Sequence, residues 1–453
     1  MKSEVPPGKI SQLLRVILLA FLAVVVSLLF WSVIRAPAIL ARDDNPRQVE
    51  SELRIQRGLI FDRADVLLAE NRLANGRSQR QYPLPAGSPV VGYYSLRHGT
   101  AGIEESYDAQ LRGNIGNTWQ SQMADLLHKP QVGRNVRLTL DAGLQAQADS
   151  LLDDQAGAVL LLRLDPSANG GEIGQILALA SHPGYDPNQL DETFDDLSAD
   201  ELAPLLNRVT QGQYQPGLVL QPFVLAAALE QEVISLDDPV EHANRPVILH
   251  GVATYCATAP PVDATWQDVL AHRCPGPMQD LAGKLDLTQV FTDFGLTQPP
   301  QLPLNTETAV SPPSANPALA TIGQDTLIVT PLQVGVAWAA LAANGRLPEL
   351  QLVNALQDDL GNWVSSALEM GTATAVSAVA AQSVRQALPA TTDTQAFSTL
   401  VLSGPGGSTN AWYLGLAPAN QPEYVVVVVV ENSGDLAAVE RIGSELLTAV
   451  TPR

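Results

Sequence analysis

Positive charge is scarce in this sequence. Its 26 lysine and arginine residues are outnumbered by 47 aspartate and glutamate residues, which gives a net charge of −21 at pH 7. This balance excludes nucleic acid as a partner, because phosphate binding requires clustered basic residues, and it opposes a general attraction to anionic lipid head groups. Lysine occurs at four positions only: Lys2, Lys9, Lys129 and Lys284. Any chemistry that needs lysine in the C-terminal two thirds of the chain therefore has one candidate.

Cysteine is also scarce. Cys256 and Cys274 are the whole set, and their spacing matches no zinc pattern, which would need more ligands than two thiols. The histidines show no metal-ligand spacing either, so the sequence predicts no metal site and no cofactor. If this segment lies outside the cytoplasm, the two cysteines can form a disulfide; otherwise they are separate free thiols.

One long hydrophobic segment is present, at residues 16–34. At about 1.5 Å rise per residue, these 19 residues would form a helix of about 28 Å, close to the thickness of the hydrocarbon layer of a membrane. Lys2, Lys9 and Arg15 precede it and favour a cytoplasmic tail at residues 1–15. A cleaved signal peptide is the alternative, but the run is longer than a usual signal core and a proline lies in the small-residue site behind it. We therefore expect an uncleaved, single-pass anchor in the cell membrane, with a large extracytoplasmic body.

Beyond the anchor the sequence divides into two parts. Residues 49–131 mix short apolar runs with glycine and proline and contain no long periodic helix, so we expect a small irregular domain there. Residues 136–453 are expected to form one large domain. Its predicted strands are residues 136–140, 158–164, 173–179, 412–416 and 424–430, and its predicted helices are a segment capped by Asp141 and residues 222–230, 331–343 and 436–450.

The order of these elements indicates an α+β fold. The runs at 158–164 and 173–179 flank Asp-Pro and Asn-Gly-Gly turn residues, which is typical of a β-hairpin. The strand at 424–430 contains six consecutive valines, as suits a central strand buried on both faces. Strands, then helices, then strands and a terminal helix predict a central antiparallel sheet flanked by helices.

Several motifs follow one another in a fixed order along the chain. They are Arg57-Gly58-Leu59-Ile60-Phe61-Asp62-Arg63, Gly102-Ile103-Glu104, Tyr107-Asp108, Leu138-Thr139-Leu140-Asp141, and residues 176–188, 205–217, 322–331 and 411–418. Together they resemble class B penicillin-binding proteins, the peptidoglycan D,D-transpeptidase family. The resemblance implies a transmembrane anchor at 16–34, a pedestal (dimerisation-like) domain at 49–131 and a transpeptidase domain with the serine β-lactamase-like fold at 136–453. It also implies contact with a polytopic glycan polymerase and other cell-wall synthesis proteins, and with peptidoglycan peptides.

The three catalytic motifs of that family are missing. The Ser-x-x-Lys motif falls on Leu218-Val219-Leu220-Gln221; leucine has no nucleophilic atom, and glutamine accepts no proton near neutral pH. The Ser-x-Asn motif falls on Arg273-Cys274-Pro275. The Lys-Thr-Gly motif falls on Gly404-Pro405-Gly406, where Pro405 has no N–H to donate from an edge strand.

The lysine content supports this interpretation without any alignment. The family mechanism needs two lysines in the transpeptidase domain, and Lys284 is the only lysine from residue 130 onward. No shift of register restores both motifs. The resemblance therefore implies a protein of peptidoglycan synthesis, in cell division or elongation, that is catalytically inactive: a pseudo-transpeptidase scaffold or regulator.

The alternative is an active transpeptidase or carboxypeptidase that uses a non-standard nucleophile. Ser403, Ser408 and Thr409 flank the third motif. Cys274 lies in the second motif, two residues from His272, and this pair is a candidate catalytic dyad. Covalent labelling by a penicillin distinguishes this hypothesis from an inactive protein.

Overall fold

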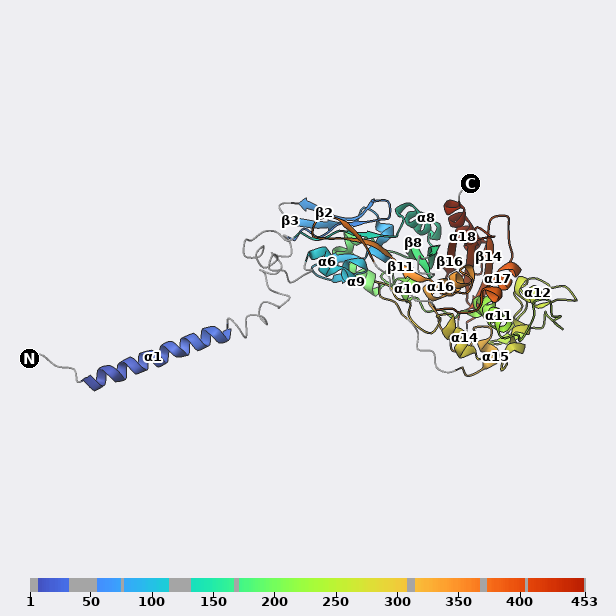
Figure 1. Cartoon of the computed structure of the whole chain (residues 1–453), viewed down its shortest axis with the longest axis horizontal. Helices are drawn as coiled ribbons and strands as arrows, with labels where there is room; N and C mark the ends of the chain where they lie inside the picture. Colours follow the sequence, from blue (N-terminus) through green and yellow to red (C-terminus); the bar gives the residue numbers. More distant parts are fainter. Residues whose placement is uncertain are drawn as a thin grey trace, which may run out of the picture.

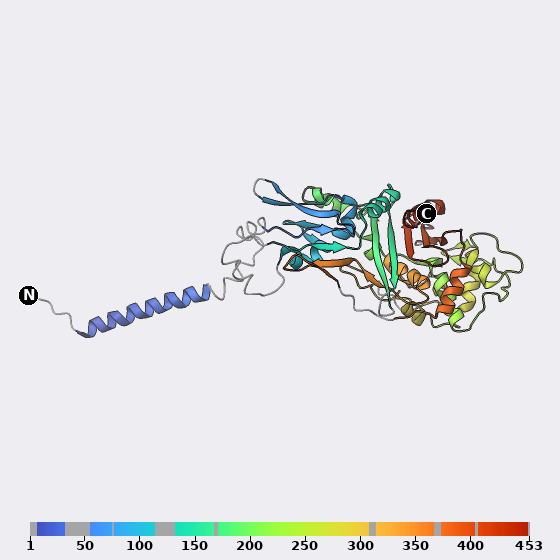
Figure 2. The same cartoon turned by 45° about the horizontal axis from the view of Figure 1, so that its top comes forward.

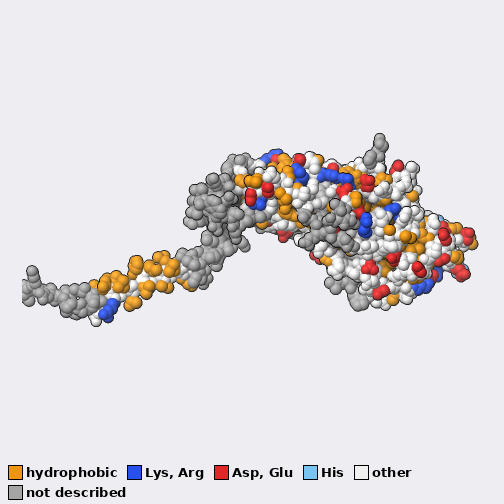
Figure 3. Space-filling model, in the orientation of Figure 1, with side chains coloured by type: hydrophobic (Ala, Val, Ile, Leu, Met, Phe, Trp, Pro, Cys, Tyr) orange, Lys and Arg blue, Asp and Glu red, His pale blue; other side chains and the backbone are white. Residues whose placement is uncertain are grey.

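The computed structural model describes residues 7–31, 55–74, 77–113, 132–166, 171–307, 314–366, 373–403 and 406–451. Helix α1 (Pro7–Leu29) stands clear of the folded body, and its apolar side chains from Leu13 onward are exposed (Figure 1, Figure 3). Its 23 residues measure about 34 Å at about 1.5 Å per residue. Among the described residues, α1 is the one helix long and apolar enough to cross a membrane. Residues 1–6 and 32–34 of the expected tail and anchor lie outside the described residues.

A six-stranded sheet forms the centre of the larger domain (Figure 1, Figure 2). The strand order is β11-β8-β7-β16-β15-β14, and all neighbours are antiparallel except β11 and β8. The strands are β7 (Gly157–Pro166), β8 (Glu172–His182), β11 (Glu349–Gln351), β14 (Gln395–Leu402), β15 (Thr409–Ala417) and β16 (Tyr424–Val430). The predicted hairpin and antiparallel sheet are confirmed. The parallel pair was not predicted; it arises because the chain crosses the sheet through helix α16 (Pro331–Ala342) before it reaches β11.

Helices cover both faces of this sheet. The even-numbered valines of β16 pack in one apolar cluster with α8 (Ala142–Leu152) and α18 (Leu436–Val450). The odd-numbered valines pack in the other cluster with α16, all of whose 12 residues are buried. β16 lies between β7 and β15, so the prediction of a central strand buried on both faces is confirmed.

Shorter helices gather at the end of the molecule away from α1, where acidic side chains are also prominent (Figure 1, Figure 3). These elements are η4 (Gly217–Leu220), α11 (Gln221–Glu230), β9 (Val247–Leu249), β10 (Val252–Thr254), α12 (Trp266–Ala271), α13 (Pro275–Met278), η5 (Gln279–Leu281), α14 (Leu287–Asp293), α15 (Pro317–Ala320) and α17 (Ala378–Ala387). The turn η4 leads directly into α11, so the residues of both are held at one place beside β14.

A second six-stranded sheet, of order β13-β12-β6-β1-β2-β3, builds the smaller domain. Its strands are β1 (Ile60–Phe61), β2 (Leu67–Ala74), β3 (Arg77–Gln81), β6 (Val136–Leu138), β12 (Val353–Gln357) and β13 (Trp363–Ser365). Three of them come from beyond residue 131, where we expected this domain to end. The reason is pairing: β6 joins β1 in parallel, and β12 then joins β6. The sheet therefore ties the two parts of the chain together.

Further short elements occur among the described residues. They are η2 (Pro85–Gly87), α4 (Ser88–Val91), β4 (Tyr93–Ser95), β5 (Gly99–Ala101), α5 (Ile103–Ser106), α6 (Asp108–Arg112), η3 (Pro187–Gln189), α9 (Leu190–Ala199) and α10 (Arg208–Gln211).

Candidate functional site

The start of α11 is where the resemblance puts a nucleophile and its base. Leu218 lies in η4 and is half-buried against the main apolar core. Gln221 is fully buried, and its Nε2 donates hydrogen bonds to the carbonyl oxygens of Val269 at 3.1 Å and Cys274 at 3.3 Å. The amide of Gln221 thus bridges α11 to α12 and to the segment behind it. Neither Leu218 nor Gln221 offers an attacking oxygen or a group that takes a proton near neutral pH.

Gly217 brings this turn against the edge of the central sheet. Its φ is +53°, and a Cβ added to it would lie 2.5 Å from Cγ1 of Val401 on β14. Left-handed backbone and such a close approach together require glycine. The turn η4, which leads into α11, therefore packs directly against the edge strand β14.

Arg273 stands at the first position of the second motif. Its Nη2 donates to Oγ of Ser398 on β14 at 3.3 Å, and its guanidinium carbon lies 5.8 Å from the centre of the Phe397 ring. Burial lowers the pKa of Arg273, and the nearby Glu440 carboxylate opposes this shift. The guanidinium nevertheless stays protonated in proteins, so it donates hydrogen bonds and takes no proton. Pro275, at the third position of the motif, begins α13 and is buried.

A disulfide joins Cys256 and Cys274 beside this segment. With its sulfur in that bond, Cys274 is not a thiol nucleophile. His272 instead pairs through Nδ1 with Oγ1 of Thr258 at 2.7 Å. The structure therefore does not form the candidate Cys274–His272 dyad.

The third motif position lies beyond the edge strand. Gly404 and Pro405 are outside the described residues, and Gly406 is exposed in the connection between β14 and β15. The strand itself ends at Leu402 and meets η4 through Val401. Its sequence, Gln-Ala-Phe-Ser-Thr-Leu-Val-Leu, contains no lysine. The sequence does contain a signal for the end of β14. Strand-forming residues up to 402 are followed there by the turn-forming run Ser-Gly-Pro-Gly-Gly-Ser.

Ser403 and Thr409 stand at the two ends of the connection between β14 and β15. The N–H of Ser403 donates to the carbonyl oxygen of Ser408 at 2.8 Å, which closes the turn. Oγ1 of Thr409 donates to the carbonyl oxygen of Ser433 at 2.9 Å. Among the described residues, no hydrogen bond joins one of these hydroxyl groups to a basic side chain.

Ser398 is a residue that the sequence motifs did not single out. Its Oγ donates to Oε1 of Glu440 at 2.5 Å and accepts the hydrogen bond from Arg273. Ser398 is only 3% exposed, and Glu440 belongs to α18, which covers the face of the sheet opposite the core against which Leu218 packs. This hydroxyl is therefore buried between Glu440 and Arg273, the residue at the first position of the second motif.

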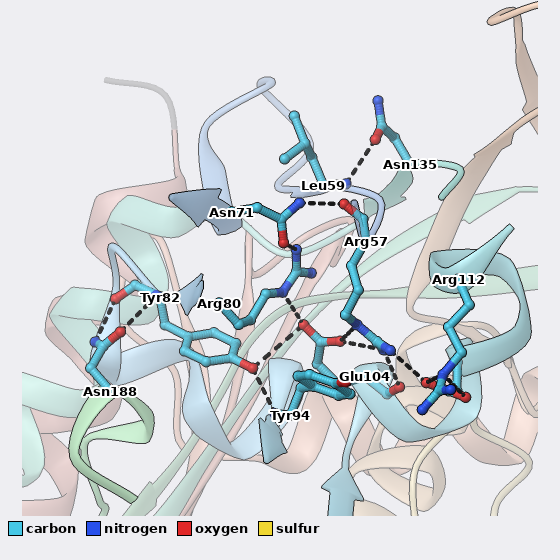
Figure 4. A network of polar contacts seen from close by, with 11 residues as sticks. Arg57, Leu59, Asn71, Arg80, Tyr82, Tyr94, Glu104, Arg112, Asn135 and Asn188 are labelled. Carbon is cyan, nitrogen blue, oxygen red and sulfur yellow. Dashed lines mark hydrogen bonds and ion pairs between the residues drawn. The ribbon is translucent and has the colours of Figure 1, made fainter. Parts of the chain in front are cut away.

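The signature residues of the smaller domain form a buried ion-pair network (Figure 4). Glu104 is fully buried and accepts hydrogen bonds from Arg57 at 2.7 Å and from Arg80 at 2.6 Å. Arg57 also pairs with Asp108 at 2.7 Å and lies 4.2 Å from the centre of the Tyr94 ring. Burial lowers the pKa of Arg57, but the charges and hydrogen bonds of Glu104 and Asp108 outweigh it, so the pKa is raised overall. The network joins β3, α5 and α6 to the segment before β1.

Two other signature residues hold the chain beside β1: Asp62 links it to the larger domain, and Gly58 packs within the smaller one. Asp62 uses Oδ1 to accept two N–H groups of its own turn, and Oδ2 accepts the N–H of Ala142 at the start of α8 at 3.1 Å. Gly58 lies so near the chain before β6 that an added Cβ would be 1.9 Å from the carbonyl oxygen of Arg134. Both contacts depend on residue type, which explains why these residues form a recognisable motif.

Comparisons with known proteins agree with this geometry. The family model for the penicillin binding protein transpeptidase domain matches residues 172–448, and the model for the penicillin binding protein A dimerisation domain matches residues 57–136. Peptidoglycan D,D-transpeptidase PbpA of Mycolicibacterium smegmatis is 30% identical over 447 residues, with 89% of each chain covered. PbpA of Mycobacterium tuberculosis is 30% identical over 450 residues, with the same coverage.

Solved structures give the same result. Penicillin-binding protein A from M. tuberculosis, as an imipenem acyl-enzyme complex, matches with a TM-score of 0.78 and 26% identity, covering 88% of this chain and 99% of that one. The penicillin G acyl-enzyme complex matches with a TM-score of 0.76 and 26% identity, covering 87% and 99%. The chain therefore belongs to the class B penicillin-binding proteins, a family that acts on peptidoglycan in cell-wall synthesis. Within that family it is similar to PbpA along most of its length.

Proposed function

We propose that this protein is a membrane-anchored, catalytically inactive class B penicillin-binding protein, which acts as a scaffold or regulator of peptidoglycan synthesis in cell division or elongation. The observation that carries the proposal is the start of α11. Leu218 stands where an attacking oxygen is needed, and the amide of Gln221 is bonded to two backbone carbonyl oxygens. The M. tuberculosis relatives that were solved as acyl-enzyme complexes hold a β-lactam covalently, and Leu218 offers no atom for that bond.

The size of the expected loss supports this proposal. Removing the nucleophile or the base of such a site typically costs roughly 10⁴- to 10⁶-fold in rate. Here both are replaced, Arg273 and Pro275 stand in the second motif, and β14 contains no lysine. Binding effects alone would remain, and they do not complete an acyl transfer.

The proposed place of the protein follows from α1 and the disulfide. We assign residues 1–15 to the cytoplasm, residues 16–34 to the membrane and the two folded domains to the outside of the cell. An extracytoplasmic location suits the Cys256–Cys274 disulfide, because disulfides persist in oxidising compartments.

The proposed partners follow from the ion-pair network of the smaller domain. The ion-pair network around Glu104 is complete, whereas the start of α11 lacks the reactive groups of the family. We therefore propose that the pedestal retains its contact with a polytopic glycan polymerase or another cell-wall synthesis protein. The transpeptidase-like domain would bind peptidoglycan peptides without cutting them.

A labelling experiment tests the chemical half of this proposal. The full-length protein in detergent is incubated with a fluorescent penicillin beside M. tuberculosis PbpA as the positive control. We expect PbpA to be labelled covalently and this protein to remain unlabelled. Labelling that disappears in Ser403→Ala, Ser408→Ala or Thr409→Val would instead establish an enzyme with a non-standard nucleophile.

A complementation experiment tests the scaffold half. In source cells that lack the chromosomal copy, a variant with all three of those hydroxyl substitutions is expected to restore growth as well as the wild type. Removal of α1 is expected to abolish restoration. Failure of the triple variant at normal protein levels would show that the cell needs chemistry from this site.

A further inference from the structure

The hairpin formed by β9 and β10 is apolar on both of its faces. Val247 and Leu249 point inward and are buried in the main core. Ile248 lies on the opposite face, directly across from Ala253, and is 63% exposed. Tyr255 continues this outer face by the two-residue alternation of a strand and is 52% exposed. A hairpin with one face on the core normally presents polar side chains to solvent, so the outer face departs from the usual pattern.

The outer strand of this hairpin is fastened to the body of the domain. Cys256, just beyond β10, forms the disulfide with Cys274, which is fully buried. The N–H of Ala257 donates to the carbonyl oxygen of His272 at 2.9 Å, and the N–H of Cys256 donates to Oδ1 of Asn244 at 3.3 Å. A two-stranded hairpin is only marginally stable by itself, so these links hold it in place. The apolar face is thus presented in one fixed arrangement, which reduces the conformational entropy lost when a partner binds.

Acidic residues lie in the segments that flank the hairpin. From residue 230 to residue 268 the sequence contains seven aspartate and glutamate residues and one arginine, which is already paired with Asp280. Backbone pairing between their neighbours brings the exposed Glu241 and Asp263 close together. Figure 3 shows acidic side chains at this end of the molecule. A basic surface would therefore be attracted to the hairpin, and an acidic one would be repelled.

The charge and the position of the hairpin favour one kind of occupant. A lipid surface is opposed because the flanking carboxylates repel anionic head groups, and the hairpin lies at the end of the molecule away from α1 (Figure 1). A second copy of this chain would bring the same carboxylates together. An exposed aromatic ring beside aliphatic side chains, with charged residues around them, is typical of the surfaces that bind other proteins.

We propose that the outer face of the β9–β10 hairpin docks a second protein, whose contact surface is apolar at its centre and carries lysine and arginine at its rim. Ile248 and Tyr255 form the centre of the contact, and Glu241 and Asp263 face the basic rim. The hairpin belongs to the larger domain, so this surface is separate from the pedestal. The inference depends neither on the pedestal contact nor on the chemistry of the site beside α11.

Site-specific photo-crosslinking in source cells tests this surface. The full-length protein carries p-benzoylphenylalanine in place of Tyr255, and a control protein carries it in place of the exposed Thr448 on α18. We expect position 255 to capture a protein that position 448 does not capture. Ile248→Ser is expected to reduce that adduct at least about 5-fold, because it removes an apolar side chain from the centre of the contact. Leu202→Ser, at a residue that is 57% exposed between α9 and α10, is the matched control and should leave the adduct unchanged.

The captured protein then serves as the probe for binding to the purified full-length protein in detergent. Biolayer interferometry is expected to show binding about 10-fold weaker for Ile248→Ser than for the wild type. Raising the salt concentration from 50 to 300 mM is expected to weaken wild-type binding about 3- to 10-fold, because salt screens the contact between carboxylates and the basic rim. The double variant Glu241→Gln, Asp263→Asn is expected to lose most of this salt dependence.

Four results would overturn the proposal. One is an adduct at position 255 no stronger than that at position 448 when the two proteins are present at equal levels. Another is an adduct that contains only a second copy of this chain. The third is equal binding by the wild type and Ile248→Ser, and the fourth is binding that salt leaves unchanged or strengthens. Ile248→Ser and Tyr255→Ser both leave the buried face of the hairpin intact, so circular dichroism should match the wild type and either variant tests the contact.

Discussion

Replacement of Glu104 by glutamine is the sharpest test of the pedestal network. The carboxylate of Glu104 is fully buried and is paired with Arg57 at 2.7 Å and with Arg80 at 2.6 Å. Glutamine keeps the size and removes the charge. Arg57 would then keep the carboxylate of Asp108, whose side chain is 33% exposed, whereas Arg80 would keep, among the described residues, only its hydrogen bond to the amide oxygen of Asn71.

The expected cost is large for a single substitution. A charge-assisted hydrogen bond contributes about 1.5–3 kcal/mol, and two of them are weakened here. Removing one partner of a buried ion pair typically costs about 3–5 kcal/mol, which is consistent with that sum. We therefore expect the free energy of unfolding of the pedestal to fall by about 3–5 kcal/mol. The matched control is Glu105→Gln at the exposed neighbouring residue, for which we expect a change within about 0.5 kcal/mol.

Urea unfolding of the full-length protein in detergent, followed by circular dichroism, measures this difference from the shift in midpoint at constant slope. Because the pair is buried, the loss should persist at high salt, where surface ion pairs are screened. A Glu104→Gln variant as stable as Glu105→Gln would refute the reasoning, since it would show that the buried charges contribute nothing beyond their shape.

Three further predictions follow from the structure. Replacing Cys256 and Cys274 together by alanine opens a loop with a sequence separation of 18 and should lower the free energy of unfolding by about 3 kcal/mol, as measured in urea. A reductant should lower the free energy of unfolding of the wild type by the same amount and leave that of the variant unchanged. Gln221→Leu removes the donor to the Cys274 carbonyl oxygen and should cost about 1–3 kcal/mol, whereas Gln231→Leu, at an exposed residue, should be close to neutral in the same assay. Burial raises the pKa of Asp149 above 3.8, so the folded state holds that proton more tightly than the unfolded state does, and the stability of the wild type falls as the carboxyl group ionises with rising pH. Asp149→Asn cannot ionise there and should therefore gain stability relative to the wild type from acidic to neutral pH. A difference in stability that is the same at acidic and at neutral pH would contradict this prediction.

The parts of the fold that the sequence predicted well have local causes. Helix α16 begins at a Thr-Pro pair and ends at Ala342, two residues before Asn344-Gly345, whose φ angles are +54° and +85°. Both ends are therefore determined by residues next to them. The valines of β16 similarly indicate burial on both faces without reference to any partner strand.

The parts that were not predicted depend on pairing between distant residues. β12 joins the smaller domain because Ala355 lies opposite Arg137, a separation that no local pattern reveals. The end of β14 is set by its antiparallel pairing with β15, from Gln395 opposite Leu416 to Leu402 opposite Thr409. No local pattern in the sequence gives that register.

In the candidate site, too, local features could be predicted and contacts between distant residues could not. Leu218 and Gln221 could be located from the sequence, because Pro216 and Gly217 before them and Pro222 after them mark the start of a helix. What Gln221 contacts could not be predicted, since its two acceptors lie 48 and 53 residues away along the chain. The same holds for Ser398, whose hydroxyl meets groups 125 and 42 residues distant.

Intact-mass spectrometry after incubation with penicillin G measures the central claim most directly. M. tuberculosis penicillin-binding protein A, which forms an acyl-enzyme with this antibiotic, is treated in parallel. We predict that the control gains the mass of one opened β-lactam and that the mass of this protein stays unchanged. A stoichiometric adduct on this protein, mapped by digestion to one side chain, would contradict the account.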